Sequence, residues 1–224
     1  TAYRAGFRNV ELWLDAAILA NWQTVARLAR SYPNGYVLHF PNRLDLSPAT
    51  LEQTVALYRE LDCRALVIHQ PMFDRYHEAL VRLEPDLRLA VENHKLTPDG
   101  LAAWAERNPG LALDVEHVWK YTLRDGSLEQ VLGQVRDLLA RFAGKLRHVH
   151  MPGYWPGLAE HRPMYCAREL VLPVLSLLAE AGFEGQIVSE TNPPYQNLND
   201  LSMDVLLFDT WRRLHDPLLA GVGP

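Results

Sequence analysis

Seven short apolar runs, separated by longer amphipathic stretches, constrain the fold of this chain more than any other feature. The runs are rich in Val, Ile and Leu, and each is long enough for a strand but too short for a typical helix. They cover residues 9–15, 35–41, 64–71, 87–94, 111–117, 146–153 and 185–192. Strands of this kind are buried on both faces, so the pattern predicts a parallel sheet covered by helices.

The stretches between the runs carry the start and stop signals of helices. Residues 47–62 open with Ser47 and Pro48, and residues 97–110 repeat this opening with a Thr-Pro pair. Apolar residues recur at helical spacing in 126–145, which ends near Gly144, and in 167–185, which ends near Gly182. The alternation of strands and helices is uninterrupted by any linker, so we predict one domain over residues 1–224.

Seven strands are one fewer than a closed (β/α)8 barrel contains. The opening "AYRAGFRNVEL" reads as the end of a helix, a stop at Gly6 and then a strand. This reading predicts an α/β fold, a (β/α)8 TIM barrel whose first strand is missing from the N-terminus of this chain. A doubly wound sheet is the alternative, but no glycine-rich phosphate loop follows any run.

Composition narrows the class of protein. A net charge of −5 disfavours a chain whose main task is to neutralise nucleic-acid phosphates. Cys63 and Cys166 lie far apart with no CxxC spacing, as expected of reduced thiols in a cytoplasmic protein. No apolar run reaches membrane length and no basic-then-apolar leader opens the chain, so neither a membrane nor secretion is expected.

In six of the runs the apolar residues are followed by a histidine or a carboxylate where the strand is expected to end. In a parallel barrel all carboxyl ends of the strands lie on one face, where barrel enzymes place their chemistry. Each residue alone could be a helix cap, a surface charge or a hydrogen-bonded core histidine. Together, three carboxylates and three imidazoles in one concave site need a counter-charge, which a divalent cation supplies. The six residues are His39, His69, Glu92, Asp114, His150 and Glu190.

Glu92, Asp114, His150 and Glu190 would offer three oxygens and one nitrogen to such a cation. That set suits Mn²⁺, Mg²⁺, Co²⁺ or Zn²⁺ better than it suits a structural zinc held by thiolates.

Four of these runs resemble those of the xylose isomerase-like TIM barrels. The motifs "LAVENH", "LALDVEH", "LRHVHMPG" and "IVSETNPP" follow one another on consecutive predicted strands, and "RAGFRNVELW" resembles the junction of the family's first helix and second strand. The superfamily holds sugar isomerases, sugar 3-epimerases and repair enzymes of the endonuclease IV type. The resemblance spans nearly the whole chain.

The resemblance implies roles for particular residues. It implies that Glu92, Asp114, His150 and Glu190 are the metal ligands, and that His117 contacts substrate in an epimerase or a second metal in a nuclease. His39 and His69 lie where the nucleases carry ligands, and we assign them, with His117, to substrate binding.

The chain departs from both patterns in the segment after His150. Epimerases of the group carry an arginine six residues after the third ligand, where this chain has Pro156, and Arg162 is the substitute that we predict for substrate binding. The nucleases carry an Asp-x-His pair in this loop, whereas Glu160 and His161 are adjacent here.

Three functions therefore stand open at the level of sequence. The first is a divalent-metal-dependent isomerase or epimerase of a sugar or sugar-like substrate, with Glu92 and Glu190 moving a proton through an enediolate. The second is metal-dependent phosphodiester hydrolysis at abasic DNA, which the charge disfavours. The third is a metal-dependent lyase or dehydratase, or a ligand-binding barrel without turnover. A final amphipathic helix over 198–216 either covers the barrel or forms a homodimer contact.

Overall fold

A computed structural model describes residues 1–215 of the chain, and residues 216–224 lie outside the description. Its centre is one parallel sheet in which each strand pairs with the next in sequence order. The strands are β1 (Asn9–Trp13), β2 (Gly35–His39), β3 (Leu66–His69), β4 (Leu89–Glu92), β5 (Leu111–Asp114), β6 (Leu146–His150) and β7 (Gln186–Val188). The seven predicted runs thus each form a strand, and the predicted α/β barrel is confirmed.

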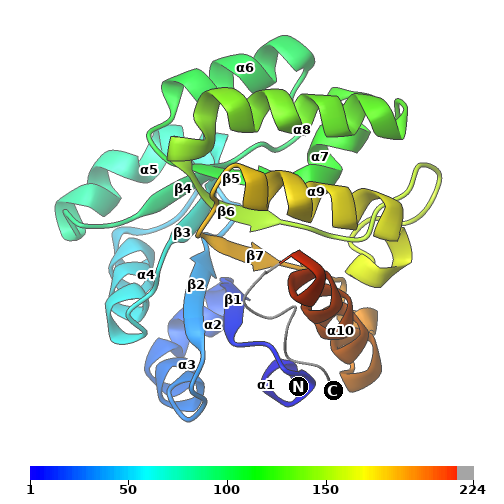
Figure 1. Ribbon diagram of the computed structural model, residues 1–224. Coiled ribbons are helices and arrows are strands. Elements are labelled where there is room, and N and C mark those ends of the chain that lie inside the picture. Colours follow the sequence, from blue (N-terminus) through cyan, green and yellow to red (C-terminus); the bar gives the residue numbers. More distant parts are fainter. Residues whose placement is uncertain (216–224) are drawn as a thin grey trace.

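Helices surround the sheet on its outer side (Figure 1). They are α1 (Ala2–Ala5), α2 (Ala16–Ala20), α3 (Trp22–Ala29), α4 (Pro48–Glu60), α5 (Gln70–Leu83), α6 (Pro98–Arg107), α7 (Val115–His117), α8 (Leu128–Phe142), α9 (Arg168–Glu180) and α10 (Leu198–His215). A π-helix, η1 (Val118–Thr122), continues α7, and short 3-10 turns η2 (Ala143–Lys145), η3 (Met164–Ala167) and η4 (Pro193–Tyr195) complete the described elements. No helix in residues 1–215 is both long enough and apolar enough to cross a membrane.

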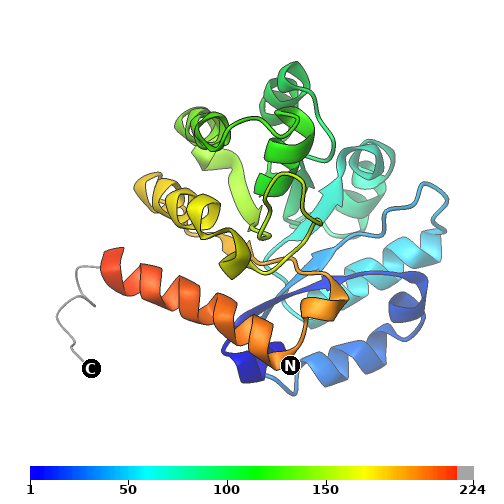
Figure 2. The same ribbon diagram turned by 90° about the vertical axis from the view of Figure 1, so that its right-hand side faces the viewer.

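The predicted helix openings form as expected. The Ser47 hydroxyl accepts a hydrogen bond from the Thr50 N–H at 3.2 Å and so caps α4. At α8, Ser127 and Gln130 form a reciprocal capping box. The last predicted helix, 198–216, corresponds to α10, which lies beside α1 along the flank of the barrel (Figure 2), while residue 216 lies outside the described part.

Alternate residues of each strand face two different environments, the surrounding helices and the barrel interior. Residues such as Leu66, Ile68 and Val91 face the helices and are fully buried in the main core. Residues of the other parity face the barrel interior. Below the mouth these are small or apolar, namely Val37, Val67, Ala90 and Ala112. Two residues further along each strand, the same parity places His39, His69, Glu92 and Asp114 at the mouth.

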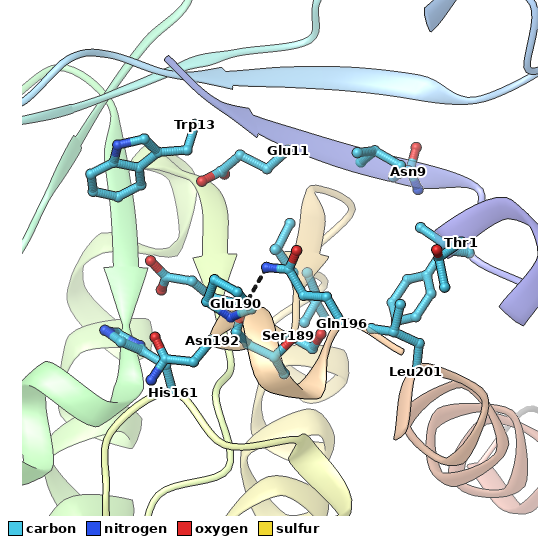
Figure 3. A pocket seen from close by; sticks show the side chains of 17 residues that line it. Thr1, Asn9, Glu11, Trp13, His161, Ser189, Glu190, Asn192, Gln196 and Leu201 are labelled. Atoms are coloured by element: carbon cyan, nitrogen blue, oxygen red, sulfur yellow. Dashed lines mark hydrogen bonds between the residues drawn. The ribbon is translucent and has the colours of Figure 1, made fainter. Parts of the chain in front are cut away.

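The barrel is nearly closed but β1 and β7 are not paired with each other among the described residues. The Gln186 side-chain amide donates to Asn9 Oδ1 at 2.8 Å across this seam. Above that contact a cavity of about 640 Å³ lies between the two strands, and Glu11, Trp13 and Glu190 line the part nearest the mouth (Figure 3).

Candidate metal centre

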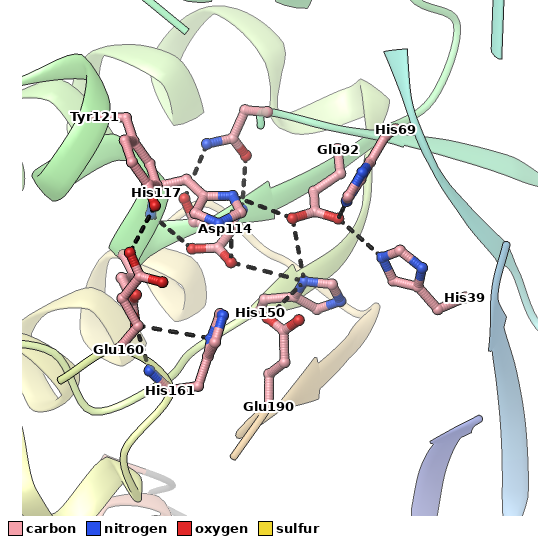
Figure 4. A network of polar contacts seen from close by, with 12 residues as sticks. His39, His69, Glu92, Asp114, His117, Tyr121, His150, Glu160, His161 and Glu190 are labelled. Atoms are coloured by element: carbon pink, nitrogen blue, oxygen red, sulfur yellow. Dashed lines mark hydrogen bonds and ion pairs between the residues drawn. The ribbon is translucent and has the colours of Figure 1, made fainter. Parts of the chain in front are cut away.

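The six polar side chains that end the predicted strands lie together at the mouth of the barrel (Figure 4). Five of the six are buried, and Glu190 is the most accessible, with 19% of its side chain exposed. The strand ends therefore bring together residues that are distant in the chain. His117, the seventh predicted contact, lies in the same cluster.

Glu92 stands at the centre of the cluster and directs its two oxygens to different partners. Its Oε2 lies 3.0 Å from His39 Nε2 and 3.0 Å from His69 Nε2. Its Oε1 lies 3.2 Å from His117 Nδ1 and 3.8 Å from His150 Nδ1. Glu92 thus separates a three-residue group with His39 and His69 from a second group around His150.

The second group contains the four predicted metal ligands. Asp114 Oδ2 lies 3.9 Å from His150 Nδ1, and Glu190 Oε2 lies 3.0 Å from the same nitrogen. Asp114 Oδ2 is also 3.6 Å from His117 Nδ1. One ring nitrogen of His150 therefore faces a carboxylate from β4, one from β5 and one from the segment after β7.

Asp114 is held in place through its backbone and through one side-chain oxygen. The Asn93 side chain accepts from the Asp114 N–H at 2.7 Å and donates to the Asp114 carbonyl at 2.9 Å. Asp114 Oδ1 accepts from the His117 N–H at 2.8 Å and so caps the helical turn α7. The predicted strand 111–117 is therefore too long. Its last three residues, 115–117, are helical because the Asp114 cap redirects the backbone. The turn and the π-helix after it place His117 over the mouth.

Glu190 reaches the site from a constrained backbone. Strand β7 ends at Val188, so Glu190 lies in the loop beyond the strand, and its predicted position at the strand end is wrong. Its φ is +45°, a left-handed conformation that is uncommon for a residue other than glycine. Such conformations cluster at functional sites, where the surrounding structure holds them.

The donor atoms of this group fit a divalent cation. Asp114 Oδ2, His117 Nδ1, His150 Nδ1 and Glu190 Oε2 are all buried, and none has a hydrogen-bond partner among the described residues. Buried polar atoms without partners are costly, and a cation bound among these atoms would satisfy them together. Carboxylate oxygens with imidazole nitrogen are donors that Mn²⁺, Co²⁺ and Zn²⁺ accept, and Mg²⁺ prefers the oxygens.

Electrostatics in the cluster are strongly coupled. Burial favours the neutral form of Glu92, but close contacts with the imidazoles of His117, His150, His39 and His69 hold the pKa of this carboxyl well below its ordinary value. Burial is the main cause that raises the pKa of Asp114 to about 7. Burial lowers the pKa of His117, yet the charges of Asp114, Glu92 and Glu190 outweigh it and raise the value to about 9. Protonated imidazoles thus balance the negative charge of the carboxylates, and a bound metal ion would take over that role.

Sequence reasoning missed Glu11 and His94. Glu11 Oε2 lies 3.1 Å from His150 Nε2 and 2.7 Å from His148 Nε2, deep in the barrel. Its signal in the sequence is a lone carboxylate of interior parity between Val10 and Leu12. His94 follows Glu92 by two residues and its ring stacks on His69 at 4.5 Å between centroids.

The loop after β6 carries the predicted Arg162. The Gly153 N–H donates to the Arg162 carbonyl at 2.7 Å, and a Cβ on Gly153 would overlap the Pro163 carbonyl oxygen, so glycine is required there. The buried Arg162 Nε has no hydrogen-bond partner among the described residues. It is instead His161 that lines the cavity, with its N–H bound to the Glu116 carboxylate at 2.9 Å.

Comparisons with known proteins find solved structures with the same fold as this chain. No model of a protein family matches the sequence, and no curated protein matches it. Among solved structures, a D-tagatose 3-epimerase-like protein superposes with a TM-score of 0.63 at 18% identity, covering 93% of this chain and 90% of that one. A xylose isomerase domain protein from Planctomyces limnophilus superposes with a TM-score of 0.60 at 15% identity, covering 92% and 88%. The chain therefore shares the TIM-barrel fold of these two structures.

Proposed function

We propose that this chain is a divalent-metal-dependent isomerase or epimerase that acts on a sugar or sugar-like small molecule. The observation that carries the proposal is the convergence of Glu92 Oε1, Asp114 Oδ2 and Glu190 Oε2 on His150 Nδ1 within 3.0–3.9 Å. The names of the two solved structures above, an epimerase-like protein and a xylose isomerase domain protein, support the same class of reaction.

In this proposal Glu92, Asp114, His150 and Glu190 hold the ion. The ion would polarise a substrate carbonyl and so acidify the neighbouring C–H bond. Glu190 is suited to take that proton, because it borders the cavity and its pKa is held below the ordinary value, against the effect of burial, chiefly by the charge of His150. Glu92 is the candidate to deliver a proton to the opposite face of an enediolate. Only 1% of its side chain is exposed, and four imidazoles surround it. Substrate oxygens would contact His117, His39 and His69. Arg162, the fourth predicted contact, is not among the residues that line the cavity.

Solvent proton exchange tests the proposal. Metal-stripped protein would be loaded with Mn²⁺ or Co²⁺ and incubated in D2O with a panel of ketoses and aldoses, and loss of the C1 or C3 proton signal would be followed by NMR. Exchange is expected only with the ion and only in protein that retains Glu190, so Glu190→Gln is the matched negative control. Absence of exchange across a broad panel, in protein with a demonstrated bound ion, would contradict the proposal.

A second candidate function rests on a specific observation. His39 Nε2 and His69 Nε2 lie 3.0 Å from Glu92 Oε2, so a second ion could share Glu92 with the first. Two or more adjacent ions favour phosphodiester hydrolysis, because they can stabilise both the attacking and the leaving oxygen. Counting ions per chain by elemental analysis after dialysis separates the two: one ion supports the isomerase, while two or three support the hydrolase.

A further inference from the structure

Glu11 is a buried carboxylate that the proposed chemistry leaves unused. It lies on the inner face of β1, with 6% of its side chain exposed, at the edge of the cavity between β1 and β7. An ionised group inside a barrel is costly unless charged partners and hydrogen bonds surround it. Its partners are two histidines of β6, and one of them, His150, is a proposed metal ligand.

The two ring nitrogens of His150 face opposite groups. Nδ1 faces Glu190, Glu92 and Asp114, as described above. Nε2 lies 3.1 Å from Glu11 Oε2 in hydrogen-bond geometry. A neutral imidazole carries one N–H, and a carboxylate accepts hydrogen bonds but cannot donate one. The contact with Glu11 therefore selects the tautomer with its proton on Nε2, which leaves the Nδ1 lone pair directed at the three carboxylates.

We propose that Glu11 is a positioning residue for the metal centre: it fixes the ring orientation and the tautomer of His150 so that Nδ1 can bind the ion. The proposal rests on the proposed function, since it requires that His150 is a ligand. A carboxylate behind a ligating histidine also makes the ring a stronger donor. Glu11 would thus act on the ion without touching it.

His148 also contacts Glu11, but its ring nitrogen is not in hydrogen-bond geometry with that carboxylate. It lies one layer below His150 on the same strand face, is fully buried, and places Nε2 2.7 Å from the same Glu11 oxygen. The carboxylate therefore lies in contact with two rings whose planes are perpendicular to each other, with centroids 5.0 Å apart. This contact also provides the competing explanation, in which Glu11 merely neutralises the buried His148 and has no role at the metal.

Metal affinity distinguishes these explanations. Glu11→Gln keeps the size of the side chain but replaces the charged acceptor by a neutral amide that can also present an N–H to His150. Loss of an outer-shell partner of this kind typically weakens metal binding about 10–100-fold, and that is the expected change in the Kd for Co²⁺. The control is Asn9→Ala, which removes a side chain of the same strand and parity whose contact is with Gln186 and not with the cluster. Its Kd should equal that of the unmodified chain.

The experiment is isothermal titration of metal-stripped full-length protein with Co²⁺, with the visible Co²⁺ spectrum and the melting temperature of the metal-free protein recorded for each variant. A weaker Kd and a shifted spectrum in Glu11→Gln alone support the positioning role. A lower melting temperature with an unchanged Kd and spectrum would overturn it, because Glu11 would then serve only the fold. If the unmodified chain binds no Co²⁺, the metal centre itself fails and this role fails with it, so the two failures are distinguishable.

Discussion

Asp114 shows how one residue serves both the fold and the site. Its Oδ1 caps the turn that carries His117, while its Oδ2 is buried in the cluster without a hydrogen-bond partner. Capping and metal binding are therefore not alternatives for this side chain. In the proposed metal centre each oxygen would have one of the two tasks.

This division predicts the behaviour of Asp114→Asn. Asparagine is as good a helix cap as aspartate, so the turn and the stability of the metal-free protein should be retained. A neutral amide oxygen is a poorer ligand than a carboxylate, so the affinity for Mn²⁺ should fall by more than about tenfold. Titration calorimetry measures this, with Asp45→Asn on the exposed Arg43 pair as the control. An unchanged affinity in Asp114→Asn would remove Asp114 from the ligand set.

His150 and His148 are both fully buried on one strand face but should respond differently to truncation. His150→Ala should abolish metal binding with a modest loss of stability. His148→Ala should weaken folding more than metal affinity, by about 1–3 kcal/mol, because it leaves a buried carboxylate with one partner fewer. Urea unfolding of the metal-free proteins and titration with Mn²⁺ provide the two measurements. The reverse pattern would show that His148, not His150, faces the ion.

At the scale of elements, the ends of β4 and β5 are joined by the Asn93 side chain. Its two hydrogen bonds satisfy the buried N–H and carbonyl of Asp114. Asn93→Ala should therefore cost about 1–3 kcal/mol of stability, and it should also weaken metal binding because Asp114 loses its anchor. The matched control is Asn108→Ala, which removes a buried amide whose two hydrogen bonds, to Gln70 and to the Trp104 carbonyl, do not involve the cluster. It should lose comparable stability and keep its metal affinity; equal loss of affinity in both variants would mean that Asn93 acts only through general stability.

The sequence predicted the strands well and their ends poorly. An apolar run marks where a strand is buried, but the residues after it look alike whether the chain continues straight or turns into a helix. At residues 115–117 the turn is decided by the Asp114 cap, and at residues 70–71 by the start of α5 directly after β3. Glu190 lies beside His150 in the cluster, yet its left-handed backbone depends on contacts of the whole loop, which no local pattern records.

Glu11 marks the limit of the same reasoning within the site. A single carboxylate in an apolar run also fits an exposed edge strand, and only its distance from His148 and His150, some 140 residues away in the chain, shows its place. Strand-end residues were predictable because a parallel barrel gathers them at one face whatever the details of packing. Glu11 was not, because it precedes the end of its strand.

At the scale of the whole molecule, the cluster should exchange protons for metal. His117, with a pKa of about 9, is protonated at pH 7, and a cation bound beside it would favour loss of that proton because like charges repel. Asp114, with a pKa of about 7, is partly protonated and must lose its proton to act as a ligand. Metal binding at pH 7 should therefore release protons, and affinity should rise as pH increases from about 6 to 9. Calorimetry in two buffers of different ionisation enthalpy measures the release. Binding that is independent of pH and of buffer would contradict this electrostatic picture.

The central claim, that this mouth is a divalent metal centre, is tested most directly by anomalous diffraction from crystals of the Co²⁺-loaded protein at the cobalt edge. We predict a peak about 2.0–2.2 Å from the donor atoms of Glu92, Asp114, His150 and Glu190, the bond length usual for oxygen and nitrogen ligands of such ions. A second peak beside His39 and His69 would move the balance toward the two-metal hydrolase. A peak only elsewhere, or no peak at the mouth despite bound cobalt in solution, would contradict the account.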